Sequence, residues 1–150
     1  PHENYIDRKS SAFVGLYENL VEDLDFEYSR PQENGYRTDV RWFRALNENN
    51  IGFEIKGEPL ISFSAHYNTI EDFDDGLRPN NPGEKVGTRK RIIKKQRKPI
   101  DVPKRDFISL NIDLKQMGVG GDNSWGARTL PKYTINPGSY TYSFTIYPVN

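Results

Sequence analysis

The chain has 150 residues, and its 21 Lys and Arg side chains balance 21 Asp and Glu, so no net field favours nucleic acid or membrane partners. The absence of cysteine excludes disulfides, thiolate nucleophiles and cysteine-ligated metals. The length predicts one domain, and an aromatic content of 13% supplies apolar area for a core despite a mean hydropathy of -0.81.

Alternating apolar and polar side chains predict short strands in the first half of the chain. Residues 38–46 alternate with one irregularity, and residues 47–50 would form the turn that follows. Residues 51–55 alternate strictly, residues 57–59 (Gly-Glu-Pro) predict another turn, and residues 60–64 resume the extended pattern. We therefore expect three antiparallel strands in series.

Two further strands and one short helix complete the expected elements. Residues 107–114 alternate, and residues 140–146 alternate most clearly, with Tyr, Tyr, Phe and Ile on one face. Residues 69–77 predict a helix of two turns at most, with Thr69 as N-cap and acidic residues in the first turn. Because crossover helices are lacking, we predict an all-β, antiparallel sandwich with at most one short helix.

Residues 85–105 form a basic stretch, with ten Lys and Arg side chains against one acid, Asp101. One interpretation is a patch for nucleic acid. The stretch has no aromatic side chain for base stacking, and the rest of the chain has an acidic excess. A solvated loop or edge strand is therefore favoured, and its charge could complement an acidic neighbour.

Classical catalytic and metal-binding patterns do not occur in the sequence. The two histidines, His2 and His66, lie far apart, and we interpret His66 as a packed or hydrogen-bonded residue rather than a ligand. The densest acidic cluster comprises Glu71, Asp72, Asp74 and Asp75. Because Gly76 is misplaced for a calcium loop, the cluster predicts a solvated helix face. No self-contained catalytic machinery is indicated.

A glycine-rich loop, residues 117–126, is the most distinctive local feature. It has four glycines within nine residues, and Trp125 stands near its end outside any strand pattern. An exposed indole flanked by short polar side chains offers a flat apolar face and hydrogen-bonding groups to a sugar ring. The same Trp could instead fold back and plug the loop, and the residues alone leave both interpretations open.

The sequence resembles the C-terminal, or small-chain, domain of bacterial beta-galactosidases of glycoside hydrolase family 2. Residues 1–8 look like the family's Pro-x-Glu-Asn-Tyr-x-Asp-Arg block, and residues 31–37 resemble its Pro-Gln-Glu-Asn-Gly-x-Arg block, which residues 39–42 extend. Residues 63–72 and 110–126 complete the matching blocks. The resemblance spans nearly the whole chain and implies the C-terminal portion of an antiparallel β-supersandwich.

The resemblance also implies an activity for the parent protein. The family hydrolyses terminal beta-D-galactosides such as lactose with retention, using two glutamates on a separate TIM barrel. Magnesium and a monovalent cation would bind on other domains, so this chain itself would hold no cofactor. Trp125 would stack on the incoming substrate and its aglycone at the rim of the barrel site. Asp122, Asn123 and Ser124 would support that loop or touch ligand.

Several expectations follow for the chain and its parent. With no starting Met, signal-peptide pattern or run of 18 apolar residues, the chain looks like a piece of a longer protein. Its partners would be the barrel domain and a beta-galactoside, without nucleic acid or membrane, in a homo-oligomer of the bacterial cytoplasm or periplasm. Alone, the chain would be inactive. A stand-alone carbohydrate-binding module is the alternative.

The departure from the family is the basic stretch, which has Arg97-Lys98-Pro99 where relatives often carry a His-Thr pair.

Overall fold

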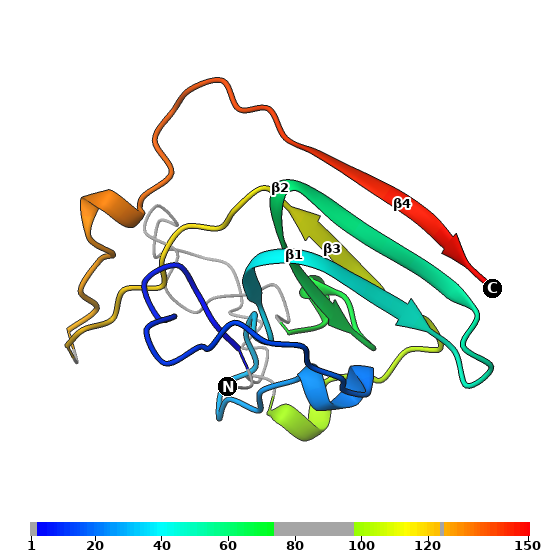
Figure 1. Cartoon of the computed structure of the whole chain (residues 1–150). Coiled ribbons are helices and arrows are strands. Elements are labelled where there is room, and N and C mark those ends of the chain that lie inside the picture. The colour runs from blue at the N-terminus through cyan, green and yellow to red at the C-terminus, as the bar shows by residue number, and fades with distance from the viewer. Residues whose placement is uncertain (1–2, 74–97, 124) are drawn as a thin grey trace, which may run out of the picture.

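Strands and single 3₁₀ turns make up the regular structure of the described residues. The computed structural model (Figure 1) describes residues 3–73, 98–123 and 125–150. The strands are β1 (Arg37–Leu46), β2 (Gly52–His66), β3 (Ser109–Asp113) and β4 (Ser143–Val149). The 3₁₀ turns are η1 (Val21–Leu24), η2 (Ile70–Phe73), η3 (Pro99–Asp101) and η4 (Pro131–Tyr133). This confirms the all-β, antiparallel architecture that the sequence predicts.

Strand β2 is the centre of the described sheet, because β1, β3 and β4 each pair with it in antiparallel fashion. β1 follows one edge of β2, while β3 and β4 share the opposite edge. β4 pairs with the first half of β2, from Gly52 to Glu58, and β3 pairs with its last five residues, from Ser62 to His66. The hydroxyl of Tyr142, just before β4, donates to the carbonyl of Ile112 in β3 (3.0 Å) and links the two partner strands.

The expected strand at residues 38–46 and the turn after it are confirmed. The Asn47 side chain caps the turn, since its Oδ1 accepts hydrogen bonds from the backbone N–H groups of Asn49 (2.9 Å) and Ile51 (3.0 Å). The irregularity predicted within this strand is a register shift on either side of Val40. Asp39, at φ 58°, supplies the left-handed backbone of the bulge.

The turn predicted at residues 57–59 is wrong, because β2 runs without reversal through this point. Gly57 and Glu58 still pair with β4, and the pairing with β3 starts at Ser62. Pro59, which has no N–H to donate, thus occupies the junction between the two partner strands, after a cis Glu58-Pro59 bond. Glycine and proline mark an irregularity within one strand here, so two of the three expected strands are a single one.

The remaining predicted elements are shorter or shifted. β3 occupies the centre of the expected 107–114 strand, and β4 begins three residues later than the expected 140–146 strand and continues to Val149. Of the helix expected at 69–77, the structure has the single turn η2, and residues 74–77 lie outside the described part of the chain. Thr69 donates from its backbone N–H to the Asp72 carboxylate (2.9 Å), so the acidic side chain caps the turn.

The core of the described residues is small. Its buried apolar residues are Tyr5, Tyr36, Ile55, Ile61 and Ala65. The rings of Tyr5 and Tyr36 stack at 5.7 Å between centroids, and the backbone N–H of Asn4 donates to the carbonyl of Tyr36 (2.8 Å). These contacts attach the N-terminal segment to the start of β1, and Asp7 and Arg8 lie next to the glycine-rich loop.

Candidate functional site: the Trp125 loop

The glycine-rich loop folds back on the segment that follows it. The N–H of Gly118 donates to the carbonyl of Tyr133 (2.9 Å), and the N–H of Gly121 donates to the carbonyl of Ala127 (2.7 Å). Two features of the backbone at position 120 favour glycine over any residue with a side chain. Gly120 adopts φ +63°, and a Cβ there would lie 2.6 Å from the backbone nitrogen of Thr129. The loop conformation thus depends on the close approach of its backbone at Gly120 to the backbone of Thr129.

The carboxylate of Asp7 holds the base of this loop. It accepts hydrogen bonds from the backbone N–H groups of Val119 (3.1 Å) and Gly120 (2.9 Å), and from the Thr129 hydroxyl (3.4 Å). Burial alone would raise the pKa of Asp7, but the N–H donors of Gly120 and Val119 and the charge of Arg8 lower it below its usual value. Asp7 is therefore an ionised, buried acceptor for successive amides.

Arg8 forms hydrogen bonds to the other side of the same turn. Its Nη2 donates to the carbonyl of Gly120 (2.5 Å) and to the carboxylate of Asp122 (2.8 Å). Asp7 and Arg8 thus contact the loop together, one through its amides and the other through a carbonyl and a side chain. Figure 1 shows the N-terminal segment, in dark blue, beside the chain that leads into this loop.

Trp125 is presented to solvent at the end of the loop. Its side chain is 92% exposed, so it does not plug the loop. The Oδ1 of Asn123 accepts hydrogen bonds from the N–H groups of Trp125 (2.9 Å) and Ala127 (3.2 Å), which fixes the backbone on both sides of Gly126. Asp122 and Asn123 therefore stabilise the loop, whereas Ser124 lies outside the described residues.

A pocket of about 480 Å³ adjoins the loop through Val119. It is lined by Glu3, Tyr5, Arg8, Tyr28, Gln32, Glu33 and Val119. Glu3 is extensively bonded here, since it accepts from the Tyr28 hydroxyl and from the backbone N–H of Gly35 (2.8 Å). Burial raises the pKa of Glu33, and a hydrogen bond from Gln116 offsets only part of that rise.

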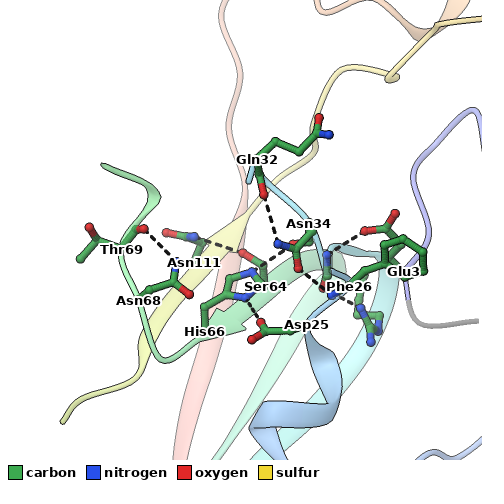
Figure 2. Close-up of polar contacts among 12 residues, drawn as sticks. Glu3, Asp25, Phe26, Gln32, Asn34, Ser64, His66, Asn68, Thr69 and Asn111 are labelled. Carbon is green, nitrogen blue, oxygen red and sulfur yellow. Dashed lines mark hydrogen bonds and ion pairs between the residues drawn. The ribbon is translucent and has the colours of Figure 1, made fainter. Parts of the chain in front are cut away.

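His66 lies in a buried polar network, as the sequence predicts. Its side chain is about 6% exposed; Nε2 donates to the carbonyl of Asn34 (3.0 Å), and Nδ1 contacts the carboxylate of Asp25. The Oδ1 of Asn34 accepts from the backbone N–H of Phe26 (2.9 Å). Figure 2 shows how these contacts attach the segment around Asp25 to the end of β2. His66 is thus structural, while His2 lies outside the described residues.

The solvated face predicted for the acidic cluster is wrong for Asp72. This residue is buried, and its carboxylate accepts from Arg105 through Nε (3.1 Å) and Nη2 (2.6 Å). These hydrogen bonds hold the pKa of Asp72 far below its usual value. The sequence could not reveal the pair, because the partner stands 33 residues away at the end of the basic stretch.

Lys104 and Arg105, at the end of the basic stretch, make contacts within the fold. Besides the Arg105 pair, Lys104 donates to Glu22 (3.1 Å) and lies 4.5 Å from the ring centroid of Tyr67. Residues 85–97 of the stretch, together with Asp74 and Asp75 of the acidic cluster, lie outside the described residues. The end of the stretch at residues 104 and 105 therefore joins η1 and η2 to the chain leading into β3.

Neither a metal-binding cluster nor a membrane-spanning helix occurs among the described residues. No three His, Cys, Asp or Glu side chains gather there in a group able to hold a metal ion. No helix there has the length and apolar character needed to cross a bilayer.

Asp7 and Arg8, which hold the loop from the N-terminal segment, are residues to which the sequence patterns assign no role. They belong to the first block of the family resemblance, and that membership was the available signal. Their function as the support of the Trp125 loop depends on a contact spanning 113 residues, which no local pattern encodes.

Comparison with known proteins gives a consistent result over the whole chain. A family model described as beta galactosidase small chain matches residues 1–146. A beta-galactosidase of Priestia megaterium is 38% identical over 150 residues, covering 99% of this chain and 13% of that protein. One of Halalkalibacterium halodurans is 32% identical over 137 residues, covering 90% and 11%, and one of Vibrio cholerae is 31% identical over 147 residues, covering 97% and 12%.

The chain spans only 11–13% of the length of these curated relatives, whose activity is therefore that of much larger proteins. The family match nevertheless covers residues 1–146, and of the described fold only residues 147–150, with the end of β4, lie beyond it. The chain belongs to the beta galactosidase small chain family.

Proposed function

We propose that this chain is the C-terminal domain of a glycoside hydrolase family 2 beta-galactosidase, which hydrolyses terminal beta-D-galactosides such as lactose. Its support is the family match over residues 1–146 and the name shared by the similar proteins. The two catalytic glutamates of the retaining mechanism belong to a separate barrel domain. The magnesium and the monovalent cation that the resemblance implies would likewise be held by other domains.

The observation that carries the proposal is the exposure of Trp125 on a loop with a specified backbone. An indole that is 92% exposed offers both of its faces, and such a platform complements the C–H groups of a pyranose ring. Asp7, Arg8 and Asn123 fix the loop in advance, so little conformational freedom is lost when a sugar binds. Trp125 therefore serves as the stacking surface for substrate and aglycone at the rim of the barrel site.

The chemistry assigns binding rather than bond cleavage to this chain. A stacking contact at the aglycone lies away from the anomeric carbon, where charge develops in the transition state. Such a contact is made equally in the ground and transition states, and it lowers KM without accelerating the chemical step. Asp122 and Asn123 hold the backbone of the loop, through Arg8 and through the amides around Gly126.

Two assays on matched samples test the proposal. The complete polypeptide that contains this chain should hydrolyse a chromogenic beta-galactoside, whereas the 150-residue chain alone should not. Titration of lactose into the 150-residue chain should give no sub-millimolar binding, because one indole without an opposing wall buries too little of a hexose. Sub-millimolar binding would support a stand-alone carbohydrate-binding module instead, and a complete polypeptide inactive on beta-galactosides would contradict the proposed function.

A further inference from the structure

Residues 13–20 form an exposed apolar strip between the N-terminal block and η1. Its large side chains are Phe13, Val14, Leu16, Tyr17 and Leu20. Phe13 is 82% and Leu16 80% exposed, although five large apolar side chains within eight residues would ordinarily be buried. Contiguous exposed apolar surface of this kind marks an interaction site.

The strip is attached at both ends. Before it, Arg8 donates to Gly120 and Asp122, and the backbone N–H of Ala12 donates to the carbonyl of Lys9 (3.0 Å). After it, Asp25 contacts His66, and the N–H of Phe26 donates to Asn34, as Figure 2 shows. The segment is thus fastened to the folded domain on either side, and its apolar side chains project from a defined place on the surface.

The strip also has a defined local shape. The hydroxyl of Tyr17 donates to the carbonyl of Phe13 (2.7 Å), which closes a turn across Gly15. A Cβ at Gly15 would lie 3.3 Å from the Tyr17 ring, so the ring covers the glycine. This local bond reduces the ordering that would be required when the strip meets a partner.

The charge around the strip restricts what can cover it. Residues 10–29 contain five acidic side chains and no basic one. Glu22 pairs with Lys104 and Asp25 with His66, while Glu18, Asp23 and Glu27 are exposed. A complementary partner therefore presents an apolar centre with basic groups at its margin. Two copies of the strip would instead bring acidic margins together, which disfavours a symmetric contact between them.

We propose that the strip docks on the catalytic domain of the same polypeptide and thereby sets the position of Trp125 over that domain's site; this rests on the proposed function. The similar proteins are many times longer than this chain, which covers 11–13% of them, so a large partner surface exists in one molecule. The strip begins five residues after Arg8, which holds the Trp125 loop. A surface that binds the strip is therefore mechanically connected to the loop through Asp7 and Arg8.

Thiol labelling in the complete enzyme tests the proposal, because this chain contributes no cysteine of its own. Phe13→Cys and Leu16→Cys are compared with Ile100→Cys, whose wild-type side chain is 91% exposed on η3. Modification by a maleimide is followed at the peptide level by mass spectrometry, in native buffer and in denaturant. We expect labelling at positions 13 and 16 to be at least tenfold slower than at position 100 in native enzyme, and equal in denaturant. Equal native rates would overturn the proposal.

A photo-reactive maleimide attached to Leu16→Cys then identifies what covers the strip. Cross-links to peptides of the domain that carries the catalytic glutamates, within one polypeptide, are the expected result. Cross-links to any other domain of the polypeptide, to a second polypeptide, or within residues 1–150 would overturn it. Hydrolysis of a chromogenic beta-galactoside is measured on the same sample. Inactivity would count against the proposed function, whereas protection of the strip is read independently of activity.

Discussion

The backbone N–H of Gly120 donates a 2.9 Å hydrogen bond to the carboxylate of Asp7, across 113 residues of sequence. This bond joins the first block of the family resemblance, residues 1–8, to the loop that carries Trp125. The same carboxylate also accepts from Val119, so one buried charge orients two successive amides. The position of the exposed indole therefore depends on a residue at the other end of the chain.

Asp7→Asn should loosen the Trp125 loop. An amide offers one acceptor oxygen, and its NH₂ group would face a backbone N–H donor, leaving buried polar groups unsatisfied at a cost of about 1–3 kcal/mol. Urea unfolding should show this loss, and hydrogen exchange should be faster at Val119 and Gly120. Asp122→Asn, at an exposed carboxylate, is the matched control and should change stability by less than about 0.5 kcal/mol. Equal stability of Asp7→Asn and wild type would contradict this assignment.

Gly120→Ala and Gly121→Ala separate steric crowding from backbone strain. Both glycines have positive φ, at +63° and +74°, but a Cβ meets backbone atoms only at Gly120, and nothing lies within 4 Å of it at Gly121. Gly121→Ala should cost about 1–2 kcal/mol from its left-handed backbone alone. Gly120→Ala should cost about 1–3 kcal/mol more through overpacking. Thermal unfolding of both variants checks the order, and equal losses would mean that the close approach to Thr129 is not maintained.

Acid should weaken the fold through the Asp72–Arg105 pair. Hydrogen bonds from Arg105 lower the pKa of Asp72 in the folded state. The ionised pair therefore stabilises the fold above the unfolded pKa of about 4, and this contribution is lost as pH falls through the lower, folded-state pKa. Asp72→Asn should be less stable than wild type at pH 7, with a difference that narrows towards pH 2 in urea titrations. Glu71→Gln, exposed on the same turn, is the control, and a pH-independent difference for Asp72→Asn would refute the explanation.

Alkaline pH should destabilise the fold, because unfolding lets the buried and partly buried tyrosines ionise. Burial, and next a hydrogen bond to Glu3, raise the pKa of Tyr28 to about 12. Burial also raises the pKa of Tyr5 and Tyr36 well above the usual value. Because these groups keep their protons in the folded state, the associated stability is complete below pH 10 and declines as pH rises towards 12. Absorbance at 295 nm should show a late phase that coincides with loss of the circular dichroism signal. Tyr28→Phe should reduce that phase, and full ionisation of all tyrosines before unfolding would contradict the prediction.

Local patterns predict β1 and its turn well, because alternation and Asn-rich turn chemistry are short-range properties. They fail at residues 57–59, where Gly and Pro are compatible with a turn and with a bulge, and only the partner strands on the far edge of β2 decide between them. β4 is found but shifted, since its alternation extends into residues before the pairing begins.

In the candidate site, too, the sequence predicts the local feature but not the contacts between residues that lie far apart in the chain. Trp125 stands out in the sequence because glycines surround it, and its exposure excludes the loop-plug alternative that the residues left open. The supporting contacts of Asp7 and Arg8, and the burial of Asp72 by Arg105, depend on residues distant in sequence. Such pairs become visible only when the sheet has brought the segments together.

Steady-state kinetics of Trp125→Ala in the complete enzyme tests the central claim most directly, with Trp125→Phe as the matched aromatic variant. Because the indole is 92% exposed, Trp125→Ala should leave the urea midpoint unchanged. It should raise KM for lactose by roughly tenfold, equivalent to about 1.4 kcal/mol of binding, while kcat stays nearer to wild type and Trp125→Phe retains much of the affinity. A collapse of kcat with KM unchanged, or unfolding of the domain, would contradict a stacking role for Trp125 at the rim of the site.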